Sequence, residues 1–242
     1  MSHFKFLPAC LMALAGLAAH ADEIARFKAD LDGDGKSETI RLSVSPGVDE
    51  AHSLLTVAIG GGRFSTQTFD VDGAMPELRV VAIDAKSRLR QVIVETFEAD
   101  SCRYDIVGYH AGRLVRLLTF DGGPGCEAPN PLGQGVLATR TWAGFWWRTE
   151  SYRLAADGAS LKKVEQTEYD VNVAGAAGVG LVLGGATCET APIDSGAFVR
   201  VTRFDAKLDR YLLEGPGRAC GWVPASDLSD IAGKVCNLPY AG

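Results

Sequence analysis

The sequence predicts an all-β protein. Its apolar runs are short and alternate with polar residues, which is the pattern of strands with one buried face. The 28 glycines and 10 prolines bound these runs at frequent intervals, as tight turns require. No stretch keeps apolar residues at a helical period of 3.6 for three turns. The clearest alternating runs are residues 39–44, 90–94, 105–109 and 114–118.

Residues 1–21 are typical of a secretory signal. Lys5 gives a positive start, residues 7–19 are apolar but too short to span a bilayer, and Ala-His-Ala at 19–21 offers the small-x-small pattern of a cleavage site. The sequence therefore predicts cleavage before Asp22 and a periplasmic or secreted protein.

A lipid anchor is the alternative to simple cleavage. Residues 7–10 resemble a lipoprotein box, which would leave Cys10 acylated. The proline at position 8 is unusual in such a box, and little apolar chain precedes the cysteine. Cleavage before Asp22 is the prediction that we keep.

The charge balance bears on the partners of the chain. The formal net charge is −6 and becomes −7 when Lys5 leaves with the signal, and no basic block is present. We therefore expect no nucleic acid partner. No membrane span is expected either, because the longest uncharged stretch, 171–187, is glycine-rich and shorter than the roughly 20 residues that a helix needs to cross. We interpret it as a flexible connection running into a strand.

Five cysteines remain after Cys10 leaves, and an oxidising compartment favours disulfides between them. Cys102 and Cys126 flank a predicted hairpin at 104–120, so we predict a bridge between them. Five is an odd number, so at least one thiol stays unpaired or bonds another molecule. The sequence does not choose among the other three, which are Cys188, Cys220 and Cys236.

The strongest motif is an acidic loop of the form Asp-x-Asp-x-Asp-Gly-x-x-Glu. Calcium takes six to eight oxygen ligands, and alternating acids on a tight loop direct several carboxylates inward. Gly35 permits the turn around the ion. The alternative is a solvated acidic turn without an ion, in which four acids would repel one another. The predicted ligands are Asp30, Asp32, Asp34 and Glu38, with the backbone carbonyl of Lys36.

A weaker copy of the loop follows at 83–93, with one residue fewer. Asp84 is aligned with Asp30, but two basic residues replace acids, so this copy is not expected to bind a cation and must be held by hydrogen bonds and packing. The other aligned pairs are Lys86 with Asp32, Arg88 with Asp34, and Gln91 with Glu38. A third acidic turn has only part of the pattern, namely Asp70, Asp72 and Glu77.

The acidic loop is not an EF-hand, because Arg41 stands where the last acid would be and no helix flanks the loop. It resembles the strand-loop-strand calcium loop of FG-GAP and VCBS-type propeller repeats. Later hairpins at 104–120 and at 147–171, the second turning at 156–159, repeat the strand-turn-strand unit. We therefore predict a propeller-like antiparallel sheet domain at 22–175.

After about Gly184 the predicted strands become short and closely spaced, and the domain boundary is predicted near 174–186. The short strands predicted here at tight spacing include Gly221-Trp222-Val223-Pro224 and Asp227-Leu228. This stretch resembles the bacterial SH3-like (SH3b) module. The resemblance implies a linker and a small barrel at 176–242, with Trp222 in its core.

Two aromatic segments can be interpreted in more than one way. Residues 142–147 hold three tryptophans and a phenylalanine; on a strand they are either buried on both faces or offer one face to a partner. Residues 195–198, Ser-Gly-Ala-Phe, resemble the Ser-Gly-x-Tyr loop of some periplasmic lysozyme inhibitors. The first strand of the SH3-like module would explain residues 195–198 equally well.

The residue inventory does not favour an enzyme. After the signal only His52 and His110 remain as histidines, and no nucleophile elbow, metalloprotease motif, phosphate loop or dinucleotide fingerprint is present. Glu95 and Glu98 could be proposed as a glycosidase pair, but sequence spacing cannot test the separation that such a pair needs.

Taken together, the acidic loop, the degenerate repeats and the export signal resemble the periplasmic calcium-binding β-propeller-like immunity proteins, which are related to lysozyme inhibitors. The resemblance covers residues 22 to about 175 and implies inhibition of a peptidoglycan-degrading toxin. The family's inhibitory residues cannot be carried over. A cell-wall or protein-binding envelope module without inhibitory activity is the alternative, and a purely structural role in the envelope is a third.

Overall fold

The computed structural model describes most of the chain after the predicted signal. The described residues are 22–46, 52–59, 62–69, 76–98, 101–110, 112–185, 188–228 and 233–239. The predicted signal at 1–21, with Cys10, and the acidic turn at 70–73 lie outside them. Within the described ranges, no helix is long and apolar enough to cross a membrane.

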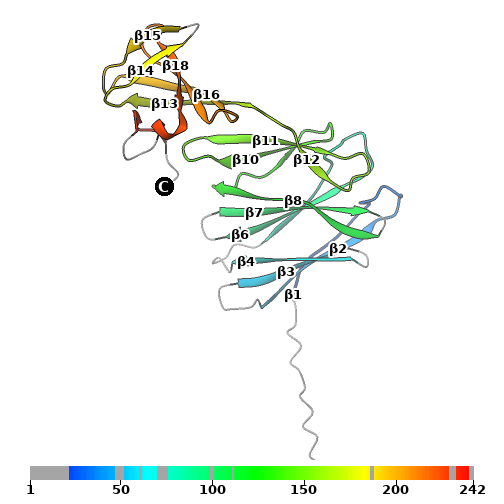
Figure 1. Ribbon diagram of the computed structural model, residues 1–242. Coiled ribbons are helices and arrows are strands. Elements are labelled where there is room, and N and C mark those ends of the chain that lie inside the picture. Colours follow the sequence, from blue (N-terminus) through cyan, green and yellow to red (C-terminus); the bar gives the residue numbers. More distant parts are fainter. Residues whose placement is uncertain are drawn as a thin grey trace, which may run out of the picture.

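Three four-stranded antiparallel sheets follow one another along the chain and are stacked in that order (Figure 1). Sheet 1 consists of β1 (Asp22–Ala29), β2 (Glu38–Pro46), β3 (His52–Ile59) and β4 (Gly62–Phe69). Sheet 2 consists of β5 (Glu77–Val81), β6 (Gln91–Glu98), β7 (Ser101–His110) and β8 (Arg113–Pro124). Sheet 3 consists of β9 (Asn130–Pro131), β10 (Val136–Trp142), β11 (Trp147–Leu154) and β12 (Leu161–Lys163). The all-β prediction is confirmed.

The buried apolar side chains lie between the sheets. Ile40 and Leu42 are buried against sheet 2, whereas Arg41 between them is exposed, as the alternation of a strand requires. Sheet 2 is covered on both faces: Val92 packs toward sheet 1, and Ile93 belongs to the cluster that reaches Leu137 of sheet 3. This two-sided burial explains why residues 91–94 are all buried.

A fourth, C-terminal sheet has the strand order β18-β17-β16-β13-β19, and a two-stranded ribbon lies beside it. Its strands are β13 (Glu168–Ala177), β16 (Phe198–Asp205), β17 (Arg210–Glu214), β18 (Cys220–Pro224) and β19 (Val235–Cys236). The ribbon is β14 (Val182–Gly185) with β15 (Cys188–Pro192). The chain therefore enters this sheet at Glu168, ahead of the boundary predicted near 174–186. Asp227-Leu228, expected to be extended, lies in a 3-10 turn, Ala225–Leu228.

The glycine-rich stretch is mostly strand over its described residues, 171–185, where we expected a flexible connection running into a strand. It contains the end of β13 and all of β14. A Cβ on Gly178 would lie 2.8 Å from the carbonyl oxygen of Gly233, and one on Gly175 would lie 3.0 Å from that of Cys236. These glycines therefore allow two backbones to pass closely, because any side chain would collide.

The aromatic segment at 142–147 is a turn, so its interpretation as a continuous strand is wrong. β10 ends at Trp142, β11 begins at Trp147, and the two indoles meet edge to face with ring centroids 5.2 Å apart. Phe145 and Trp146 at the turn are 6% and 3% exposed and belong to the core of the C-terminal sheet. Burial is thus confirmed for these two, and the turn joins sheet 3 to the C-terminal sheet.

Trp222 does not lie in the core that was predicted for it. On β18, Gly221 and Val223 point inward and are buried, so alternation directs Trp222 outward, where it is half-buried. The Arg210 guanidinium carbon lies 4.6 Å from the centre of its ring, which is a cation–π distance.

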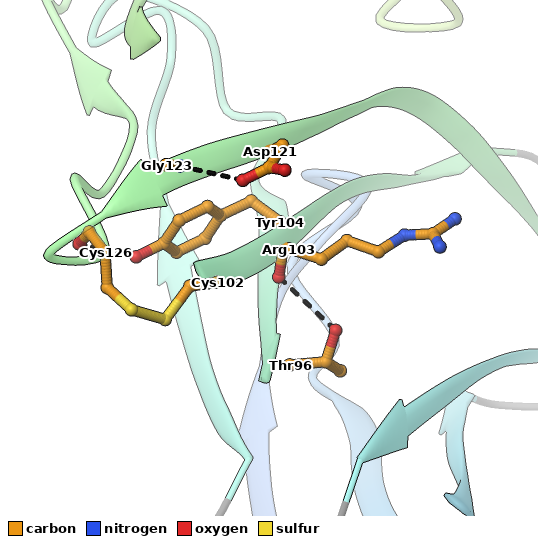
Figure 2. Close-up of a disulfide and its surroundings, with 7 residues drawn as sticks. All are labelled: Thr96, Cys102, Arg103, Tyr104, Asp121, Gly123 and Cys126. Carbon is orange, nitrogen blue, oxygen red and sulfur yellow. Dashed lines mark hydrogen bonds between the residues drawn. A yellow bond between two sulfur atoms is a disulfide. The ribbon is translucent and has the colours of Figure 1, made fainter. Parts of the chain in front are cut away.

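The predicted Cys102–Cys126 disulfide is present, with Cα atoms 4.9 Å apart (Figure 2). It ties the start of β7 to the chain after β8, and the Tyr104 hydroxyl beside it donates a hydrogen bond of 2.9 Å to the Cys126 carbonyl. A second disulfide joins Cys188 to Cys220, which resolves the choice that the sequence left open, and Cys236 is an exposed free thiol.

Replacing both Cys102 and Cys126 with alanine is expected to lower the free energy of unfolding by about 3 kcal/mol, because the bridge closes a loop with a sequence separation of 24. Urea unfolding monitored by tryptophan fluorescence measures the change. Cys236→Ser is the control and should shift the value by less than about 0.5 kcal/mol. A double variant as stable as this control would contradict the prediction.

Candidate metal centre

The acidic loop connects β1 to β2. Asp30 follows the last residue of β1 and Glu38 is the first residue of β2, where it pairs with Ala29 across the two strands. The hairpin therefore brings the first and the last acid of the motif to the same end of sheet 1.

The backbone of the loop is organised by Asp30. Its two carboxylate oxygens accept hydrogen bonds from the N–H groups of Gly33 (2.8 Å) and Gly35 (3.0 Å). Both glycines have positive φ angles, +75° and +87°, which side chains with a Cβ rarely adopt. The glycines in the motif thus let the chain wrap around the first carboxylate.

Three of the four predicted carboxylates come together. Asp30, Asp32 and Glu38 each offer an oxygen, and these oxygens all lie within 4.8 Å of one another. Such a cluster suits a hard cation, which would offset the repulsion among the acids. The cluster is only partly buried, so water could complete the coordination.

Asp34 is not part of this cluster. One of its oxygens accepts a hydrogen bond of 2.7 Å from the backbone N–H of Lys36, and the other lies 3.7 Å from the Lys36 ammonium. The side chains of both residues are exposed. Coordination by Asp34 and by the Lys36 carbonyl stays a prediction.

The charges of the acidic loop affect Tyr109, which lies near the end of β7 in sheet 2. Burial raises the pKa of the Tyr109 hydroxyl, and the charges of Glu38, Asp32 and Asp34 raise it further. A cation bound among these carboxylates would reduce that second contribution.

The second loop, between β5 and β6, contains one acid, Asp84, and is held by hydrogen bonds. Gln91 is 1% exposed, and its side-chain oxygen accepts a hydrogen bond of 3.1 Å from the backbone N–H of Ile83. Glu38 does the same in the first loop, accepting from Leu31 N–H at 2.7 Å. The predicted equivalence of Gln91 and Glu38 is thus confirmed, and the second loop is held by hydrogen bonds as expected.

The alignment of Asp84 with Asp30 is wrong. The Asp84 carboxylate accepts a hydrogen bond from the N–H two residues on, that of Lys86, at 3.0 Å, and Asp32 makes the same two-residue bond at 3.2 Å. Asp84 is therefore the counterpart of Asp32. The two loops differ in length. Ile83 and Gln91, which are hydrogen-bonded in the second loop, are eight residues apart, whereas Leu31 and Glu38 in the first loop are seven apart.

The two loops contact each other. Arg90 N–H donates a hydrogen bond of 2.9 Å to the Leu31 carbonyl, and a Cβ on Gly33 would lie 2.5 Å from the Cβ of Arg88. The order of the acidic loop is thus tied to the packing of sheet 1 against sheet 2.

The other polar candidates are dispersed. Glu95 lies opposite Tyr104 on sheet 2, and burial raises the pKa of its carboxyl group. Glu98 is the last residue of β6, with its side chain outside the described set. His110 ends β7 and is exposed.

The turn that precedes Phe198 is held by two backbone hydrogen bonds. Gly196 N–H donates to the Ala177 carbonyl at 2.7 Å and Ala197 N–H to the Asp194 carbonyl at 3.0 Å, which fixes the turn against β13. Phe198, at the start of β16, is 59% exposed. Alternation alone could not distinguish an exposed phenylalanine at the start of a strand from one in the core.

Comparison of the chain with protein-family models, with curated proteins and with solved structures finds no match.

Proposed function

We propose that this chain is an exported binding protein that inhibits a peptidoglycan-degrading, lysozyme-like enzyme, in the manner of an immunity protein. The two disulfides fit a periplasmic or secreted protein. In this proposal the three stacked sheets are a propeller-like scaffold, the C-terminal sheet is an SH3-like module, and one calcium ion at the acidic loop stabilises the scaffold. The chain binds its target and does not act as an enzyme.

The exposed Phe198 is the observation that carries the proposal. Binding energy concentrates in a few anchoring side chains, and aromatic residues are favoured in that role. Phe198 is the first residue of β16 and follows a turn held by backbone hydrogen bonds, so little ordering cost is expected when a partner covers it. Arg200 and Glu214 pair across β16 and β17 beside it and supply a polar rim.

The charge of the chain agrees with this kind of target. The net charge is −6 over the whole sequence. Enzymes that act on the anionic wall gain from a basic surface, and an acidic inhibitor would associate with such an enzyme faster.

Phe198→Ala is expected to weaken inhibition at least about tenfold, as the loss of an anchoring side chain does. The measurement is a turbidity assay on wall fragments with a panel of lysozyme-like and transglycosylase-like hydrolases. Leu208→Ala is the matched control, because Leu208 is 56% exposed on the turn between β16 and β17.

Two outcomes decide the proposal. Stoichiometric inhibition that Phe198→Ala reduces and Leu208→Ala does not would support it. Failure to inhibit any hydrolase, with sedimentation of the protein on purified peptidoglycan, would favour the alternative of a wall-binding envelope module.

A further inference from the structure

The outer face of sheet 1 carries a row of arginines. Sheet 1 ends the stack, and sheet 2 covers its other face (Figure 1). Arg26 on β1 is opposite Arg41 on β2, Arg41 is opposite Ala58 on β3, and Ala58 is opposite Arg63 on β4. Residues opposite one another in a sheet share a face, so these side chains form one line across all four strands.

The row spans the whole width of the sheet. Neighbouring strands lie about 4.8 Å apart, so Arg26 and Arg41 begin about 5 Å from each other and Arg63 about 10 Å beyond Arg41. Lys28, opposite Thr39, adds a further positive charge on the same face. All four basic residues are exposed.

Glu23 offsets part of this positive charge, because it is hydrogen-bonded to Arg26 and also lies in the field of Arg41. Arg26 makes two hydrogen bonds of 2.7 Å to the Glu23 carboxylate. No ion pair joins Arg41, Arg63 or Lys28 to any described carboxylate. In a chain with a net charge of −6, this is a local concentration of the opposite sign.

A hollow of about 650 Å³ lies at the Arg41–Arg63 end of the row. Ala58, Ser37, Thr39 and Gly62 line it beside the two arginines, and Glu38 of the acidic cluster and Tyr109 of sheet 2 complete the lining. Glu38 already accepts the Leu31 N–H on the side of the acidic loop. The two guanidinium groups are the part of the lining that suits a carboxylate ligand, because a planar guanidinium donates two parallel hydrogen bonds to it.

We propose that this arginine row is a second binding surface, which takes an extended carboxylated polysaccharide. The chain of the polymer lies along the row, and one of its carboxylates enters the hollow between Arg41 and Arg63. The choice of a wall-type polymer rests on the proposed export, whereas the surface is separate from Phe198, which lies in the C-terminal sheet at the other end of the chain.

The chemistry of the face favours a polyanion over a folded protein. A protein interface usually centres on an aromatic or other large apolar anchor in a packed pocket. The described side chains between the arginines are small or polar, namely Thr39, Ser43, Thr56 and Ala58. Affinity must then come from charge, which a polymer with repeated carboxylates supplies along its length.

The test is binding of fluorescently labelled polygalacturonate to the full chain, followed by anisotropy. Binding is expected at about 0.01 M ionic strength and should weaken at least about tenfold by about 0.15 M, as the Debye length falls from about 30 to about 8 Å. The double variant Arg41→Glu/Arg63→Glu is expected to lose at least about tenfold in affinity at low salt.

The matched control is Arg153→Glu/Arg218→Glu, which makes the same charge change at two exposed arginines of sheet 3 and the C-terminal unit. It should bind like the unmodified chain, and thermal melting should show both variants folded. Equal loss in both double variants, or no binding of the polymer at low salt, would overturn the proposal.

A second probe distinguishes a lipid surface from the polymer. Vesicles of phosphatidylglycerol and phosphatidylcholine offer phosphates instead of carboxylates. Binding of the vesicles through Arg41 and Arg63 without binding of polygalacturonate would also overturn the proposal. Inhibition of a hydrolase is measured separately, through Phe198, so failure of either surface leaves the other result intact.

Discussion

Replacing Trp146 with alanine is expected to lower the free energy of unfolding by about 3–5 kcal/mol, the range for removing a large aromatic side chain from a core. Trp146 is 3% exposed, and its Nε1 donates a hydrogen bond of 3.2 Å to the Tyr211 hydroxyl. Its ring also meets those of Tyr169 and Phe204 at centroid distances of 6.1 and 5.9 Å. All three partners belong to the C-terminal sheet, so the substitution removes a large part of the contact that joins it to sheet 3, to which Phe145 also contributes.

Thermal melting and urea unfolding measure this change, and for a chain of this size each kcal/mol corresponds to about 2–4 °C. Trp146→Phe keeps most of the packing and loses the hydrogen bond, so about 1 kcal/mol is expected. Trp222→Ala is the control, since Trp222 is half-buried and packs under Arg210 on the surface. If Trp146→Ala cost no more than Trp222→Ala, the turn would not be a structural link.

The sequence predicted strands well where one face meets the core. The runs at 39–44 and 105–109 lie in β2 and β7, because alternation reflects burial directly. The sequence did not predict the role of residues that pack against backbone far away along the chain. Gly175 and Gly178 suggested flexibility, yet both lack a side chain because the backbone near β19 passes close to them. That segment is about sixty residues away in sequence, so the residues around the glycines do not indicate it.

The aromatic turn illustrates the same limit. Burial of Phe145 and Trp146 could be expected from their apolar character, but their partners lie in strands that come later in the chain. At the acidic loop, spacing predicted that four carboxylates surround one ion, and the structure brings together three of them, Asp30, Asp32 and Glu38. Spacing could not show that Asp34 is engaged by the N–H of Lys36, because a two-residue side-chain turn and a metal ligand require the same residue type.

Calcium is expected to raise the melting temperature of the protein, which is the second large effect. A ligand that binds the native state alone stabilises it by about 2.7 kcal/mol at one hundred times its Kd. Asp30, Asp32 and Glu38 are spread along the loop and converge only when it is folded, so an unfolded chain offers no comparable site. Isothermal calorimetry should find one ion per chain, and an unchanged melting temperature with no heat of binding would contradict the prediction.

The second loop supplies matched variants for this experiment. Glu38→Gln places at position 38 the side chain that Gln91 has, and the Gln91 oxygen already accepts the equivalent backbone hydrogen bond, so the loop should keep its shape while the ion loses a charged ligand. Asp32→Asn should act alike, since an amide oxygen can still accept the N–H of Asp34. Asp84→Asn makes the same change where no ion is expected, and this variant should respond to calcium like the unmodified chain.

Because the acids lose their mutual repulsion in Glu38→Gln and Asp32→Asn, both variants should melt no lower than the unmodified chain without calcium. When calcium is saturating, both should melt clearly below it. Melting curves that separate the variants in this way assign the stabilisation to the ion rather than to the loop.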